Sequence, residues 1–298
     1  MKSSFLPFFV LLAAAGFGLT VPAQADDVPA AVQALVAKQA PAIVTVRAVL
    51  KVTAKGAGAQ TAESRAEMQG VVVDPSGLIM VSSLPFSPAK FMEMMGAPSD
   101  ASDTAPTITP TDFKVVFANE DKEYPAFLAA TDPNLGLTFL RINDLAGRIP
   151  ASVAFGKSVS PALGDPVYAL SRLSKGYDYA PFYTTARVSG VITKPRAAVM
   201  LDGGISDMGL PVFSQTGDAL GVLTSVASGV KADAFNEANG MQMMMRLFGG
   251  LSGGNHSGVF LVPASTVSAV IAQAQVRAAA LAAQRAAAKP ATAVPAAK

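Results

Sequence analysis

Residues 70–82 read GVVVDPSGLIMVS, and this stretch decides the fold class. Two apolar runs, 70–74 and 78–82, flank the turn-forming residues Pro75, Ser76 and Gly77. β-Branched residues favour strands, while proline and glycine favour the tight turn between them. Each run is also too short for a packed helix, so the stretch predicts an antiparallel hairpin.

Runs of the same kind recur along the chain, separated by turn sequences such as Asp132-Pro133-Asn134 and Gln215-Thr216-Gly217-Asp218. Many short strands with frequent turns are typical of an all-β barrel or sandwich. Two six-stranded barrels would account for the length. The other predicted strands are 43–52, 113–118, 123–130, 137–142, 166–170, 183–192, 198–201, 211–214, 219–225 and 259–263.

A short helix is predicted before this strand region, and another helix after it. Residues 29–40 place Val32, Leu35 and Val36 on one face, which is the spacing of an amphipathic helix. A second helix begins near Ser265 and continues into an alanine-rich stretch. Beyond Lys289 the chain is rich in proline and alanine, and too little apolar bulk remains to form a packed structure, so a disordered tail is expected.

The N-terminus has the order of features found in a secretory signal peptide. Lys2 precedes an apolar run, 5–21, which ends in Ala23-Gln24-Ala25 before Asp26. Cleavage is therefore predicted after Ala25, and the mature protein is expected in the periplasm or outside a bacterial cell. The expected organisation is a signal peptide at 1–25, one domain at 26–276, and a helix end with a disordered tail at 277–298. No second segment is expected to cross a membrane.

Composition excludes several classes of function. Lys and Arg total 23 against 21 Asp and Glu, without a basic stripe, so nucleic-acid binding is not expected. The chain has no cysteine, which excludes thiol catalysis and zinc–thiolate sites. Its single histidine, His256, cannot form a histidine-rich metal site, and no cofactor is predicted.

Two long segments, 91–110 and 228–257, interrupt the strand pattern and carry clustered methionines. Loops of this length are commonly functional or disordered. Three interpretations remain open: packing within the insertions, an adaptable apolar surface for a polypeptide partner, and Cu(I) binding by thioethers. The candidate partner-binding residues are Met92, Met94, Met95, Met241, Met243, Met244 and Met245.

Six ordered segments, 38–44, 70–79, 132–133, 164–167, 188–192 and 260–265, carry a resemblance to a known family. On these segments the chain resembles the bacterial HtrA (Deg) proteases from about Val28 to Gln275. The resemblance implies a trypsin-like double β-barrel, although no PDZ domain of the kind usual in that family is expected here.

At the positions where this resemblance implies a catalytic triad, the expected side chains are missing. Leu84 occupies the position of the histidine, Gly136 that of the aspartate and Met208 that of the nucleophilic serine. A serine protease needs all three groups, so no protease activity is expected. Ser206 and Leu210 also replace glycines in the loop that forms the oxyanion hole.

The sequence therefore predicts a non-catalytic, trypsin-like envelope protein that binds a polypeptide partner or regulates an active protease. Oligomers are possible, since they are common in the family. One alternative is a protease with a displaced site built from His256 and a nearby serine, Ser82, Ser83 or Ser206. The other is a metal-binding envelope protein that uses the methionine clusters.

Overall fold

The hairpin predicted at residues 70–82 forms between β2 (Thr61–Asp74) and β3 (Leu78–Ser82), with Val71 opposite Met80. The computed structural model describes residues 28–55, 60–88, 105–118, 120–156, 159–194, 196–225 and 259–288. The methionine clusters, His256 and the N-terminal 27 residues lie outside these ranges.

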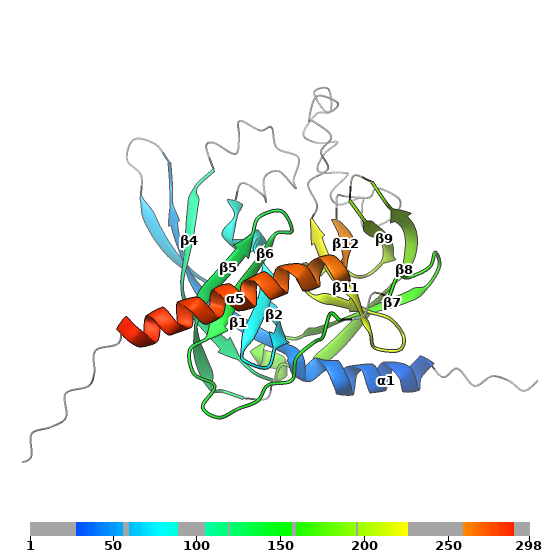
Figure 1. Cartoon of the computed structure of the whole chain (residues 1–298), viewed down its shortest axis with the longest axis horizontal. Helices are drawn as coiled ribbons and strands as arrows, with labels where there is room; N and C mark the ends of the chain where they lie inside the picture. Colours follow the sequence, from blue (N-terminus) through cyan, green and yellow to red (C-terminus); the bar gives the residue numbers. More distant parts are fainter. Residues whose placement is uncertain are drawn as a thin grey trace, which may run out of the picture.

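The described strands close into two antiparallel barrels, which lie side by side in Figure 1. This confirms the predicted trypsin-like double barrel. The first has the strand order β1-β2-β3-β6-β5-β4, with β1 (Ile43–Thr53), β4 (Thr107–Val116), β5 (Glu123–Asp132) and β6 (Leu137–Ile142). The second has the order β10-β11-β12-β9-β8-β7, with β7 (Pro166–Arg172), β8 (Pro181–Ile192), β9 (Ala198–Gly203), β10 (Pro211–Phe213), β11 (Ala219–Ser225) and β12 (Val259–Pro263).

The buried apolar residues form three clusters, and one strand can contribute to two of them because its side chains alternate between its faces. In β2, Val72 points into the first barrel, whereas Val71 and Val73 belong to a cluster outside it. Successive side chains of a strand point to opposite faces, which explains why both faces of this strand are buried. The outer cluster also includes Tyr168 and Phe213 of the second barrel, so it joins the two barrels.

Each terminal helix reaches the barrel that is more distant from it in sequence. α1 (Val28–Gln39) precedes the first barrel, but its Gln39 side chain donates a 3.0 Å hydrogen bond to the carbonyl of Gly217 in the β10–β11 turn. α5 (Ala264–Ala288) follows the second barrel and crosses the first, where it packs against β5 (Figure 1). Its Arg285 guanidinium lies 4.6 Å from the centre of the Phe127 ring.

The C-terminal helix, predicted to run from near Ser265 into the alanine-rich stretch, spans Ala264–Ala288 and is packed over much of its length. Ala278 is 1% exposed and Leu281 packs against the core. The helix end predicted from residue 277 onward continues to Ala288. By length and composition α5 would also qualify as a membrane span, which the sequence analysis did not anticipate.

A buried arginine holds the barrels together near the end of β7. The Arg172 guanidinium donates hydrogen bonds of 2.5, 2.8 and 2.9 Å to the carbonyls of Ala40, Ile43 and Tyr179. Burial lowers the pKa of Arg172, because a low-dielectric environment disfavours the charged form. The side chain thereby links the start of the first barrel to the hairpin between β7 and β8.

A second arginine reinforces the same junction from the surface. Arg47 of β1 donates to the Glu123 carboxylate at 2.8 Å and to the Tyr179 hydroxyl at 2.7 Å. The hydrogen bond from Arg47 is the main reason that the pKa of Glu123 lies below its ordinary value. The β7–β8 hairpin is therefore fixed to the first barrel by side chains from both barrels.

Candidate functional site

The segments that carry Leu84 and Gly136 lie side by side at the end of β3. The Ser83 N–H donates a 2.8 Å hydrogen bond to the Gly136 carbonyl. Leu137, which follows Gly136, pairs with Ser82 across β3 and β6. Two positions expected from sequence to belong to one site are thus held together by main-chain contacts.

The loop that carries Met208 approaches the same point from the second barrel. Gly209 has a φ of +83°, and a Cβ on this residue would lie 2.4 Å from the Ser82 nitrogen. Its N–H donates a 2.8 Å hydrogen bond to the carbonyl of Leu223 in β11. The Met208 segment therefore sits against the end of β3, so all three expected positions meet at the junction of the barrels.

A further side chain, not predicted from the sequence, links the two barrels at this junction. The Thr224 hydroxyl of β11 donates to the carbonyl of Leu135, the residue before Gly136. Thr224 is buried, and so is Ser83 on the first barrel. No local pattern distinguishes Thr224 from other strand threonines, because its partner is 89 residues away.

The three residues at the expected triad positions are a leucine, a glycine and a methionine. Leu84 begins the 3₁₀ helix η2 (Leu84–Phe86), and its N–H donates to the Ser82 hydroxyl at 3.2 Å. Gly136 has a φ of 64°, in the left-handed region that favours glycine. Leucine, glycine and methionine can neither accept a proton from a nucleophile nor attack a carbonyl.

The loop around Met208 keeps one glycine of the expected pattern and has lost others. Leu210 is 1% exposed and fills the interior, whereas Gly209 occupies a place that tolerates no side chain. Ser206 and Asp207 are the remaining polar residues of this loop. Contacts with Ser82 and with β11 therefore determine the conformation of this loop.

The described residues contain no group of three or more His, Cys, Asp or Glu side chains placed to hold a metal ion. The seven methionines proposed for partner or copper binding lie outside those residues, as does His256. The part of segment 91–110 that is described corrects one boundary, because Thr107–Pro110 is the beginning of β4.

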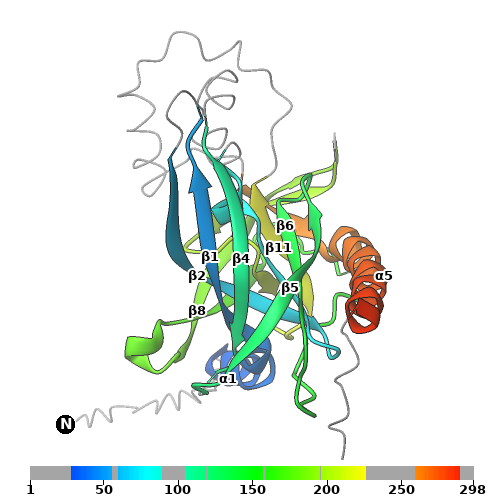
Figure 2. The same cartoon turned by 90° about the vertical axis from the view of Figure 1, so that its left-hand side faces the viewer.

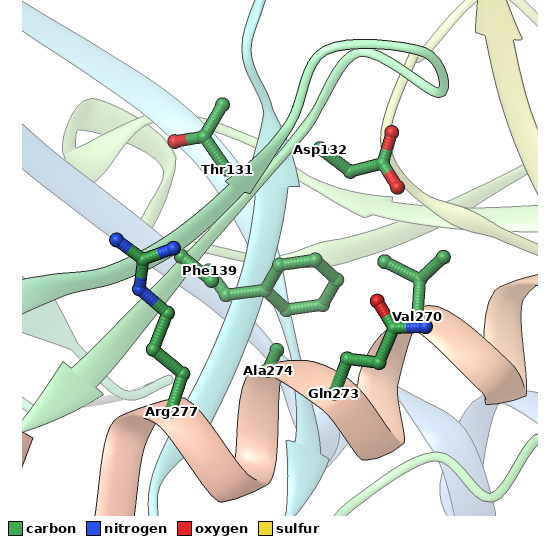
Figure 3. Close-up of a pocket in the computed structure, with 8 residues that line it drawn as sticks. Thr131, Asp132, Phe139, Val270, Gln273, Ala274 and Arg277 are labelled. Atoms are coloured by element: carbon green, nitrogen blue, oxygen red, sulfur yellow. The ribbon is translucent and has the colours of Figure 1, made fainter. Parts of the chain in front are cut away.

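A small open pocket lies between β5, β6 and α5, separate from the junction (Figure 3). Phe139 and Val270 supply apolar walls, while Asp132 and Arg277 lie at opposite sides of it. Its volume is about 110 Å³, well below the roughly 300–1,000 Å³ of typical ligand sites. Neither Leu84, Gly136 nor Met208 lines it.

A family model matches the part of the chain that contains these three positions. The model, described as a trypsin-like peptidase domain, covers residues 68–222. Among solved structures, the chain matches one titled "Crystal structure of Deg5" at 20% sequence identity, over 67% of this chain and 87% of that one, with a TM-score of 0.44. No curated protein matches the sequence.

Proposed function

This chain belongs to the family of trypsin-like peptidase domains, and we propose that it binds a polypeptide without cleaving it. The observation that carries the proposal is the convergence of Leu84, Gly136 and Met208 at the barrel junction. Ser83 N–H contacts Gly136, and Gly209 packs against Ser82. These contacts support the assignment of the three residues to the positions of histidine, aspartate and serine.

Loss of the whole triad is physically more favourable than loss of one member. A buried donor or acceptor left without its partner costs roughly 1–3 kcal/mol. The side chains of Leu84, Gly136 and Met208 bring no donor or acceptor to the junction that would need a partner. The site is thus consistent with a protein that retains the shape of the trypsin-like fold for recognition.

The resemblance to HtrA proteases suggests where in the cell the protein acts. We propose that the signal peptide is removed after Ala25 and that the protein acts in the periplasm or outside the cell. The partner would be an envelope polypeptide or an active protease. The proposed contact surface consists of Met92, Met94, Met95, Met241, Met243, Met244 and Met245, since flexible methionines adapt to varied apolar partners.

The purified protein is expected to hydrolyse neither an unfolded protein nor a broad peptide library above a buffer control. Triad residues act as a unit, and what remains without them is only the contribution of binding and the oxyanion hole. The measurement is release of new peptide amino groups over hours, with an active trypsin-like protease as the positive control. Turnover that disappears on Ser206→Ala or His256→Ala would instead establish a displaced active site.

Replacement of the seven methionines with serine is expected to abolish capture of the partner in envelope crosslinking while changing the free energy of unfolding by less than about 1 kcal/mol. A few apolar anchors usually carry most of the binding free energy, whereas buried methionines would each cost roughly 2–5 kcal/mol when truncated. The matched control replaces the same residues with leucine, which keeps an apolar surface but removes the thioether.

The leucine variant decides between the remaining interpretations. Capture retained by leucine and lost with serine supports an apolar partner surface. Capture retained by both variants, together with a large fall in melting temperature for serine, means that the methionines pack their own insertions. Copper-dependent stabilisation of the native protein that both variants lose would identify a metal site.

A further inference from the structure

The first barrel extends into an arm made of three strands. β1 pairs with β2 as far as Thr53 opposite Thr61, and with β4 as far as Thr53 opposite Thr107. Figure 2 shows these strands side by side, rising beyond the body of the barrel. The sequence predicts this strand only from Gly70, whereas β2 begins at Thr61.

The outer edge of β2 has no strand beside it among the described residues. β2 pairs with β3 only from Gly70 onward, so the main chain of Thr61–Gln69 has β1 on one side only. An edge strand presents unpaired N–H and C=O groups that can accept another strand. This stretch contains neither proline nor glycine.

The opposite edge of the arm is protected against such pairing. β4 pairs with β5 only from Phe113, but before that point it contains Pro110, which has no N–H. Asp112 has a φ of 47°, close to a shift in the register between β1 and β4. Proline and irregular backbone are the devices that prevent edge-to-edge association. Only the β2 edge therefore remains open.

The charges on this edge alternate in sign. Glu63, Arg65 and Glu67 lie on one face of β2, opposite Lys51, Val49 and Arg47 of β1. Glu67 is paired with Arg47 at 3.0 Å, and Glu63 with Lys51 at 3.4 Å. Among the described residues, the ion pairs of the arm do not include Arg65.

We propose that the β2 edge binds the same edge of a second copy of this chain, antiparallel and centred on Ser64. In that register Glu63 of each copy lies opposite Arg65 of the other, because directly opposed residues share a face. Arg65 thereby gains a carboxylate, and Glu63 is flanked by two cations. On the other face Ala62 lies opposite Ala66, and these small side chains allow the strands to approach closely.

This dimerisation does not depend on whether the chain cleaves peptides.

Pairing of one strand edge buries far less surface than the roughly 1,200–2,000 Å² that a stable protein interface buries. The dimer is therefore reversible and depends on concentration and on salt, since exposed ion pairs are screened.

The test measures the mass of the full-length protein, purified as the cell produces it, by sedimentation over a range of concentrations. The native protein forms dimers, whereas Arg65→Glu and Glu63→Arg each weaken dimerisation at least tenfold by placing like charges opposite each other. An equimolar mixture of the two variants dimerises again, because two carboxylates on one chain then face two guanidinium groups on the other. Thr109→Glu, on the protected β4 edge, is the matched control and leaves the dimer unchanged.

A crosslink fixes the register, because the native chain contains no cysteine. Ser64→Cys places the new thiol beside its counterpart at the centre of the pairing, so it forms a disulfide-linked dimer under mild oxidation. Thr109→Cys, which is also exposed, remains monomeric. A monomer at all concentrations, or a mixture of charge variants that fails to associate, overturns the proposal, as does equal crosslinking at positions 64 and 109.

Discussion

Replacement of Gly209 with alanine is expected to destabilise the protein by about 4 kcal/mol or more, at the extreme end of single substitutions. The new Cβ would lie 2.4 Å from the Ser82 nitrogen and 2.9 Å from its Cα. Both atoms belong to the main chain of β3, so no side chain can rotate away. The substitution must separate the Met208 loop from the first barrel, and it breaks the contact that aligns the candidate site.

Gly217→Ala is the matched control for this prediction. Gly217 also has a positive φ, +80°, but its nearest neighbour to an added Cβ is the Leu35 side chain at 3.6 Å. It should cost only the roughly 1–2 kcal/mol of placing a side chain in the left-handed region. Chemical denaturation of both variants measures the difference. Equal losses would mean that the loop relaxes freely away from Ser82.

Arg172→Met is expected to lower the free energy of unfolding by about 3 kcal/mol, because it breaks a buried hydrogen-bond network. The native side chain donates to the carbonyls of Ala40, Ile43 and Tyr179, with each distance at or below 2.9 Å. Methionine has a similar length but no donor. The loss of donors outweighs the relief from burying a charge, since a buried polar group left unpaired costs roughly 1–3 kcal/mol.

Arg187→Met provides the comparison on the same barrel. Arg187 is exposed and makes one hydrogen bond, 2.9 Å, to the carbonyl of Gly164. Its replacement should change stability by less than about 0.5 kcal/mol, as is usual for surface substitutions. If the two variants unfold at the same denaturant concentration, Arg172 does not hold the barrels together.

The strands of both barrels could be predicted because local residues mark them. Valine-rich runs and turns such as Asp74-Pro75-Ser76-Gly77 fix where most strands begin and end. The arm could not be predicted in the same way. Residues 61–69 read TAESRAEMQ, and this polar, alanine-containing stretch has low intrinsic strand preference. It is a strand only because β1 pairs with it.

The packing of the end of α5 and of the candidate site also depends on contacts between residues that are far apart in the sequence. Alanine-rich sequence after Val276 gives no sign of a partner, yet Arg285 reaches the Phe127 ring of a distant strand. For the site, the order of motifs predicted which residues replace the triad. The structure brings their segments together, but the contacts that do so, Gly209 with Ser82 and Thr224 with Leu135, join residues far apart in the chain. Their assignment to triad positions remains a prediction.

Both terminal helices pack against elements that are far away in the sequence. α1 is the first described element of the chain, but the turn to which it docks, around Gly217, lies 178 residues after Gln39. The first barrel is complete by Ile142, yet its cover, α5, is the final element made. A chain that ends before α5 therefore lacks the residues that pack against Phe127 and the outer face of β5.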